Sequence, residues 1–258
     1  MVGGVSLEFE TMGPAPQSSV TLVMLHEGLG CVRMWRDFPA RLGDATGLGV
    51  MTYSRQGYGQ SDPCDLPRPI DYMEREARDV LPQVLNAAGV ERAVLIGHSD
   101  GASIAALHQR EVSDPRILGL VLMAPHFFVE ELSIESIENA RVAWRETDLK
   151  DRLAKYHDNV EAAFLGWNQA WLDPGFRDWN ITDSISSFRV PTLAIQGKLD
   201  EYGTARQVEV ISELSLAPVT TTMLEDCGHS PFRDKPEETI REISEFVAGL
   251  AGVSQSLK

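Results

Sequence analysis

Cysteine, positive charge and long apolar runs are scarce in this 258-residue chain. The three cysteines, Cys31, Cys64 and Cys227, are too few for a disulfide framework, and their spacing matches no zinc motif. Lys and Arg number 23 against 38 Asp and Glu, for a net charge of −15. This charge disfavours nucleic acid and anionic membranes as partners. No apolar run reaches transmembrane length, and the first residues lack the pattern of a signal peptide. We therefore expect a protein of the reducing cytoplasm.

The composition, 43% hydrophobic and 24% charged, is that of an ordinary globular protein. Short apolar runs of strand length alternate with stretches of helical periodicity. This alternation predicts an α/β fold with a mainly parallel sheet covered by helices on both faces. The expected strands cover residues 5–10, 20–25, 49–53, 94–96, 118–123, 192–195 and 219–224. The expected helices of this layer cover residues 35–45, 72–88, 102–107 and 236–248, with Asp71 and Asp234 as N-caps of the second and last.

Residues 127–187 interrupt this alternation. They contain no convincing strand but hold four of the five tryptophans, and residues 135–145 and 149–165 have helical character. A helical insertion between two strands would lie over the sheet. We therefore predict one core domain, built from residues 1–126 and 188–258, with residues 127–187 inserted as a helical cap, or lid.

A Gly-x-Ser-x-Gly pattern follows the apolar run at 94–96. It reads Gly97-His98-Ser99-Asp100-Gly101 and leads into a helical stretch. A serine on so sharp a strand-to-helix turn has its hydroxyl held clear of the backbone, as a nucleophile requires. The alternative role for Ser99 is that of a helix N-cap, which serine also favours.

A serine nucleophile needs a base, and the base needs a group to orient it. Asp200 follows the strand expected at 192–195, and His229 follows the strand expected at 219–224. The carboxyl ends of parallel strands meet at one edge of a sheet, so Ser99, Asp200 and His229 would converge there. Asp226 and Glu201 are alternatives to Asp200 as the orienting acid.

These features resemble the α/β-hydrolase superfamily over nearly the whole chain. The resemblance rests on five segments, given in chain order: His26–Gly30, Arg55–Ser61, Gly97–Gly101, Gly197–Asp200 and Gly228-His229. It implies an α/β-hydrolase fold with a helical lid, and a serine hydrolase with the catalytic triad Ser99, Asp200 and His229. It also implies a small-molecule substrate, no cofactor and no metal.

The resemblance further implies an oxyanion hole made by the backbone N–H groups of Gly28 and Asp100. The sequence departs from the family at Glu27, where a glycine is usual after the loop histidine. His26 itself is expected to hold the loop through hydrogen bonds.

The implied substrate is a small carboxylic ester, with a thioester, a lactone or an amino-acid ester also compatible. The elbow is similar to that of valacyclovirase-like (biphenyl hydrolase-like) members, in which the acid after the serine is taken to recognise a cationic amino group. We therefore expect Glu27 and Asp100 to favour cationic substrates, unless Asp100 caps the following helix and Glu27 pairs with an arginine such as Arg33 or Arg55. Five aromatic residues are further candidates for substrate contact, unless they simply pack the lid onto the sheet: Phe127, Phe128, Trp144, Trp167 and Trp171.

Two other functions are compatible with the same frame. One is hydrolysis of a carbon–carbon bond in a ring-cleavage product. The other is a ligand receptor without enzymatic activity, for which an incomplete triad would be expected, whereas all three positions are filled here.

Overall fold

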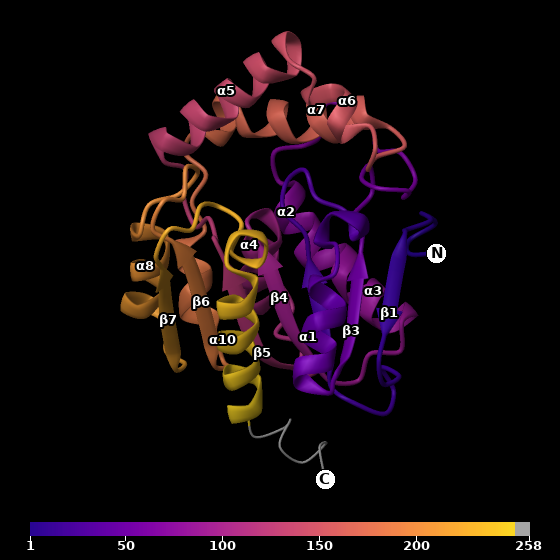
Figure 1. The fold of residues 1–258 in the computed structure, drawn as a ribbon, viewed down its shortest axis with the longest axis vertical. Coiled ribbons are helices and arrows are strands. Elements are labelled where there is room, and N and C mark those ends of the chain that lie inside the picture. Colours follow the sequence, from indigo (N-terminus) through magenta and orange to yellow (C-terminus); the bar gives the residue numbers. More distant parts are fainter. Residues whose placement is uncertain (251–258) are drawn as a thin grey trace.

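The computed structural model describes residues 1–250, in which a seven-stranded sheet carries helices on both faces (Figure 1). The strand order is β1-β3-β2-β4-β5-β6-β7, with β1 antiparallel to β3 and every other pair of neighbours parallel. The strands are β1 (Phe9–Met12), β2 (Thr21–Leu25), β3 (Gly49–Tyr53), β4 (Ala93–His98), β5 (Ile117–Met123), β6 (Thr192–Gly197) and β7 (Val219–Leu224). The α/β-hydrolase architecture expected from the sequence is confirmed.

Alternate side chains of the central strand β4 enter two separate hydrophobic cores, because successive residues of a strand face opposite sides of the sheet. Val94 and Ile96 join the core beneath α1 and α10, whereas Leu95 joins the core beneath α3 and α4. The helices beside the sheet are α1 (Phe38–Thr46), α2 (Tyr72–Arg75), α3 (Leu81–Ala87), α4 (Asp100–Glu111), α8 (Arg206–Leu214), α9 (Pro231–Asp234) and α10 (Pro236–Gly249), with η1 (Val32–Trp35) ahead of α1.

The helix expected at 72–88 is present but not uniform. A π-helical segment, η2 (Glu76–Val80), joins α2 to α3. Pro82 follows it and has no N–H to bond the Arg78 carbonyl, so the regular hydrogen-bond pattern cannot continue through this turn.

Some element ends differ from the sequence expectation. β1 begins at Phe9 rather than at residue 5, because pairing with β3 starts with Phe9 opposite Tyr53. Asp71 does not cap α2; its backbone is not extended, and its carboxylate pairs with Arg75 at 2.9 Å. Asp234 does not cap α10; it ends α9 and accepts a hydrogen bond from Gly228 N.

The chain between β5 and β6 is helical. It forms α5 (Glu131–Glu146), α6 (Leu149–Leu153), α7 (Val160–Trp171), η3 (Pro174–Phe176) and η4 (Thr182–Ser187). In Figure 1, α5, α6 and α7 lie together at the top of the molecule, apart from the sheet. The helix expected at 149–165 is divided between α6 and α7, because Asn159 starts a new helix by accepting a hydrogen bond from Ala162 N.

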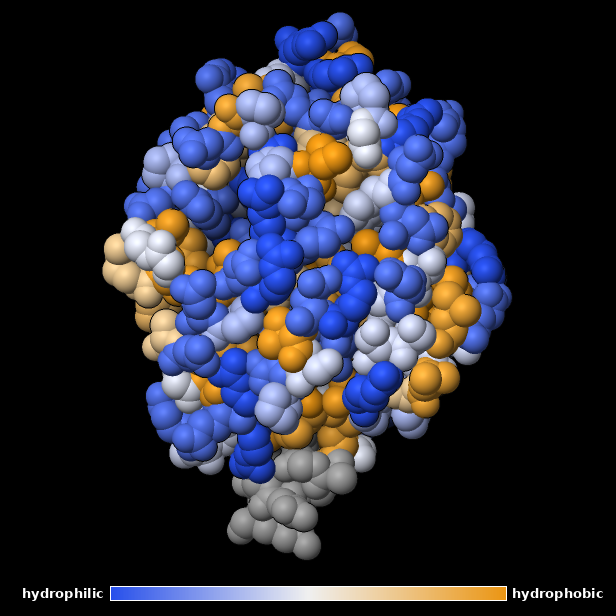
Figure 2. Space-filling model, turned by 180° about the vertical axis from the view of Figure 1, so that it is seen from behind, coloured by the Kyte–Doolittle hydropathy of each residue, from blue (hydrophilic) through white to orange (hydrophobic). Residues whose placement is uncertain are grey.

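The surface opposite the view of Figure 1 is mostly hydrophilic, with hydrophobic side chains in small groups (Figure 2). Within residues 1–250, no helix has both the length and the apolar character needed to cross a membrane.

Candidate active site

Ser99 lies on a strained turn between β4 and α4. Its φ of 53° and ψ of −119° fall in a region that residues other than glycine rarely adopt. The glycines on either side permit this turn. A Cβ on Gly97 would lie 2.3 Å from the Gly101 carbonyl oxygen, and a Cβ on Gly101 would lie 2.0 Å from that of Leu25. The sequence thus folds here into the geometry expected of a nucleophile elbow.

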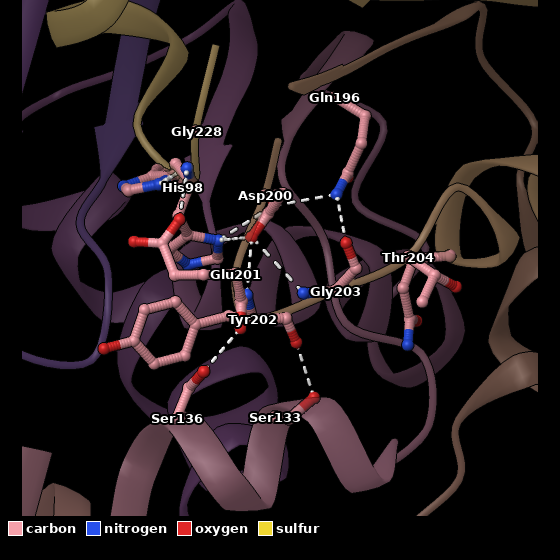
Figure 3. Close-up of polar contacts among 12 residues, drawn as sticks. His98, Ser133, Ser136, Gln196, Asp200, Glu201, Tyr202, Gly203, Thr204 and Gly228 are labelled. Atoms are coloured by element: carbon pink, nitrogen blue, oxygen red, sulfur yellow. Dashed lines mark hydrogen bonds and ion pairs between the residues drawn. The ribbon is translucent and has the colours of Figure 1, made fainter. Parts of the chain in front are cut away.

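Asp200 and His229 are in direct contact although they come from loops after different strands, β6 and β7. The His229 Nδ1 atom lies 2.8 and 2.9 Å from the two Asp200 carboxylate oxygens. Asp200 also accepts hydrogen bonds from the Gln196 side chain and from the backbone N–H groups of Tyr202 and Gly203 (Figure 3). These bonds fix the carboxylate, which in turn fixes the imidazole and leaves Nε2 as its free nitrogen.

This contact sets the protonation of both groups. Burial raises the pKa of Asp200, but the hydrogen bond and charge of His229 outweigh burial, so the pKa lies below its usual range. Burial lowers the pKa of His229, but the hydrogen bond to Asp200 and the charge of that carboxylate outweigh it and leave the pKa raised. Asp200 is therefore an anion that stabilises the imidazolium form of His229.

Ser99 and His229 line the same cavity. Among residues 1–250 no direct hydrogen bond joins their side chains, and in unliganded enzymes such contacts are often long until substrate binds. Of the sequence-predicted residues, six line the cavity: Glu27, Gly28, Ser99, Trp167, Trp171 and His229.

The loop from His26 to Gly30 directs the Gly28 N–H toward this cavity. The Glu27 carbonyl accepts hydrogen bonds from His26 Nδ1 at 2.7 Å and from the Arg55 guanidinium at 2.9 Å, both partly buried. In a trans peptide the next N–H points the opposite way. Neither the Gly28 nor the Asp100 N–H has an acceptor within the described part of the chain. Two free donors therefore lie near Ser99.

His26 holds its own loop, residues 26–30, through hydrogen bonds, as expected. It is fully buried and joined at both ring nitrogens, because its Nε2 accepts a hydrogen bond from Arg55 N at 3.0 Å. Burial keeps its pKa well below the ordinary value, so the ring is neutral and can accept that bond.

The Glu27 carboxylate does not pair with Arg33 or Arg55. Its Oε2 lies 3.3 Å from His98 Nδ1. Burial raises the pKa of Glu27, but the hydrogen bond and charge of His98 outweigh burial and lower it to about 2. An ionised carboxylate therefore faces the cavity.

The Asp100 side chain is placed differently from the expectation. It is fully buried and absent from the cavity wall. Tyr72 Oη and Trp171 Nε1 donate hydrogen bonds to its carboxylate, and the Arg55 guanidinium lies 3.9 Å away. It neither contacts the cavity nor caps α4. Instead, its bonds to Tyr72 and Trp171 connect the start of α4 to α2 and α7.

Three of the five aromatic candidates lie outside the cavity. Phe127 is buried in the core, Phe128 packs against that core, and the Trp144 ring stacks on Phe164 with centroids 4.2 Å apart. Phe128 and Trp144 are partly buried, and none of the three lines the cavity, so the structure does not bring these residues to the candidate site. Trp167 and Trp171, both from α7, do line the cavity.

Several cavity residues were not identified from the sequence. His126 follows β5, so the rule that strand ends gather at one edge could have pointed to it. Burial lowers its pKa to about 3, which keeps it neutral. Glu201 was expected only as an alternative to Asp200 as the orienting acid. The others carry no clear sequence signal and are Leu29, Ser133, Ile137, Tyr202, Ser230 and Arg233.

Helix α5 is tied to the loop that carries Asp200. Ser133 and Ser136 donate hydrogen bonds to the backbone carbonyls of Tyr202 and Glu201 (Figure 3). Helix α5 is therefore connected to the loop of Asp200 by two specific contacts.

Comparison with known proteins gives one consistent result. Residues 22–242 match the model of the Alpha/beta hydrolase family. The chain is 25% identical over 272 residues to a proline iminopeptidase of Saccharolobus solfataricus, covering 89% of this chain and 85% of that protein. It is 25% identical over 217 residues to the mouse serine hydrolase BPHL, covering 77% of this chain and 68% of that protein. An esterase structure from Exiguobacterium antarcticum superposes with a TM-score of 0.75 at 21% identity, covering 95% and 96% of the two chains.

Proposed function

This chain belongs to the alpha/beta hydrolase family, and from that premise we propose that it is a serine hydrolase that cleaves a small carboxylic ester through an acyl-enzyme intermediate. The observation that carries the proposal is the His229–Asp200 pair beside Ser99. The pair lies at a cavity shared with a serine on a strained turn and with the oxyanion loop.

The proposed reaction has two halves. His229 Nε2 takes the proton from Ser99 Oγ as that oxygen attacks the ester carbonyl, and the N–H groups of Gly28 and Asp100 stabilise the oxyanion. His229 then gives its proton to the departing alcohol. Water, activated by the same nitrogen, hydrolyses the acyl-enzyme and regenerates Ser99.

We propose further that the cavity favours esters with an ammonium group. Glu27 is ionised and lines the cavity, and Glu201 lines the same cavity. Arg233 is the opposing charge in that wall. An amino-acid ester fits this charge pattern better than a fatty acyl ester.

A second candidate reaction is the release of an N-terminal residue from a peptide. The similarity to a proline iminopeptidase favours it, and the mechanism would be the same with an amine as the leaving group.

We propose that residues 127–187 act as a lid that limits substrate size. Trp167 and Trp171 of α7 line the cavity. Ser133 and Ser136 of α5 donate hydrogen bonds to the loop that carries Asp200.

The test is a hydrolysis panel of p-nitrophenyl esters and aminoacyl p-nitroanilides on wild type, Ser99→Ala and His229→Ala. We expect each substitution to lower kcat by about 10³–10⁶-fold, because nucleophile and base act as a unit, with the circular dichroism spectrum unchanged. A Ser99→Ala variant that keeps a tenth of the wild-type activity would falsify the proposal.

A further inference from the structure

His98, the residue before Ser99, contacts both of the other loops at the site. Its Nε2 lies 2.6 Å from the backbone carbonyl oxygen of His229, and its Nδ1 lies 3.3 Å from Glu27 Oε2. We propose that His98 is a positioning residue, whose imidazole holds the base loop and the oxyanion loop in register with the nucleophile. This proposal rests on the function proposed above.

The two contacts have different chemical requirements. A carbonyl oxygen only accepts, so Nε2 carries a hydrogen and donates it to His229 O. The contact between Nδ1 and Oε2 is attractive only with a proton between the two atoms. His98 therefore donates a hydrogen bond from Nε2 to the backbone carbonyl of His229. Its Nδ1 shares a proton with the carboxylate of Glu27, which lies in the loop that carries Gly28.

The ring has little freedom to move away from these partners. Its side chain is 1% exposed, and aromatic rings flank it: Phe232 at a centroid distance of 5.3 Å and Trp35 at 6.4 Å. Phe232 belongs to α9, which follows His229 directly. The ring is thus enclosed by the elements that it joins.

The bond to the His229 carbonyl matters because the Asp200 contact alone does not fix the backbone of the loop that carries His229. Asp200 fixes the imidazole of His229 at Nδ1, but the loop backbone determines how far Nε2 lies from Ser99. A displacement of about 1 Å in such an arrangement can cost about 10²-fold in rate. Loss of the His98 donor would therefore lower kcat more than it raises KM.

Two substitutions separate the contacts. The amide nitrogen of glutamine reaches about as far as Nε2, so His98→Gln keeps a donor for the His229 carbonyl. The amide of asparagine reaches only as far as Nδ1, so His98→Asn loses that donor. The control is His108→Leu in α4, which removes a comparable contact: the Nδ1 atom of this fully buried histidine lies 2.7 Å from the Ala77 carbonyl oxygen, outside the cavity.

The measurements are kcat and KM for p-nitrophenyl butyrate, with thermal melting of each variant. We expect His98→Asn to lower kcat about 10–100-fold with KM within about threefold of wild type, and His98→Gln to keep kcat within about threefold. His108→Leu should lower the melting temperature and leave kcat unchanged. A folded His98→Asn variant with wild-type kcat, or equal losses in the Asn and Gln variants, overturns the proposal.

If His98→Asn does not fold, His98→Met takes its place, since methionine fills the space without a donor. A lower kcat for Met than for Gln then supports the proposal, and equal values contradict it. Failure of the proposed function is distinct, because wild type itself would then neither turn over an ester nor react with a fluorophosphonate.

Discussion

At the scale of single residues, Glu27 is the side chain on which we expect substrate preference to depend. Its side chain is 19% exposed, so its carboxylate can accept a hydrogen bond from a substrate ammonium group, and a hydrogen bond to a charged group contributes about 1.5–3 kcal/mol. Wild type should therefore have a kcat/KM about 10–100-fold higher for an α-amino ester than for its des-amino analogue. Glu27→Gln should remove most of this preference.

Asp100→Asn is the control for Glu27, because the Asp100 carboxylate is buried away from the cavity. It should keep the preference even if it lowers stability. Equal kcat/KM for the two esters on wild type, or a preference that survives in Glu27→Gln, would contradict the role of Glu27.

The pH dependence of kcat/KM follows from His229. The base acts in its neutral form, and the Asp200 contact raises its pKa above the ordinary 6.5. Activity should therefore fall as pH drops through a value above 6.5. In Asp200→Asn the stabilising charge is lost, so the residual activity should show its acid limb at lower pH. A limb at the same pH in both proteins would show that another group controls it.

Single-residue roles are predictable from sequence only when chain position determines them. Asp200 and His229 each follow a strand, and parallel strands bring such positions together. The partners of Asp100 could not be predicted in this way, because Tyr72 lies 28 residues from it and Trp171 lies 71 residues from it in the chain. Only their packing directs the carboxylate away from the cavity.

At the scale of elements, α7 should set the size of the accepted acyl chain. Trp167 lines the cavity beside Gly28. A Cβ added to Gly28 would lie 2.2 Å from the Trp167 indole ring. Trp167→Ala should open this wall and raise the ratio of kcat/KM for octanoyl over butyryl esters by about tenfold or more.

Trp144→Ala, in α5, is the matched control for Trp167→Ala, since the Trp144 ring stacks on Phe164 and does not line the cavity. It should lower the melting temperature with the chain-length ratio unchanged. If both variants lose stability and keep the wild-type ratio, Trp167 belongs to the core alone.

Element boundaries were predictable where burial alone determines them. β3, whose residues are all buried, spans the expected residues because it is a short run that ends at turn residues. β7 also spans the expected residues, although only its last residue is fully buried. Boundaries that depend on contacts with distant segments were not predictable. β1 starts where β3 offers a partner, and Asp234 bonds the loop of Gly228 instead of capping α10.

At the scale of the whole molecule, the sheet brings distant segments to one edge. Ser99, Asp200 and His229 follow β4, β6 and β7, which lie on one side of the sheet with only β5 between β4 and β6. The loop of residues 26–30, with the proposed oxyanion donor Gly28, follows β2, the neighbour of β4 on the other side. The cavity therefore lies where the strand order places the ends of these four strands.

The nucleophilic role of Ser99 is tested most directly by reaction with a fluorophosphonate probe, followed by intact mass and peptide mapping. We expect one adduct, on Ser99, in the wild-type protein, far slower labelling in His229→Ala, and none in Ser99→Ala. A folded wild-type protein that takes up no label, as expected of a ligand receptor, or equal labelling of wild type and Ser99→Ala, would contradict the assignment.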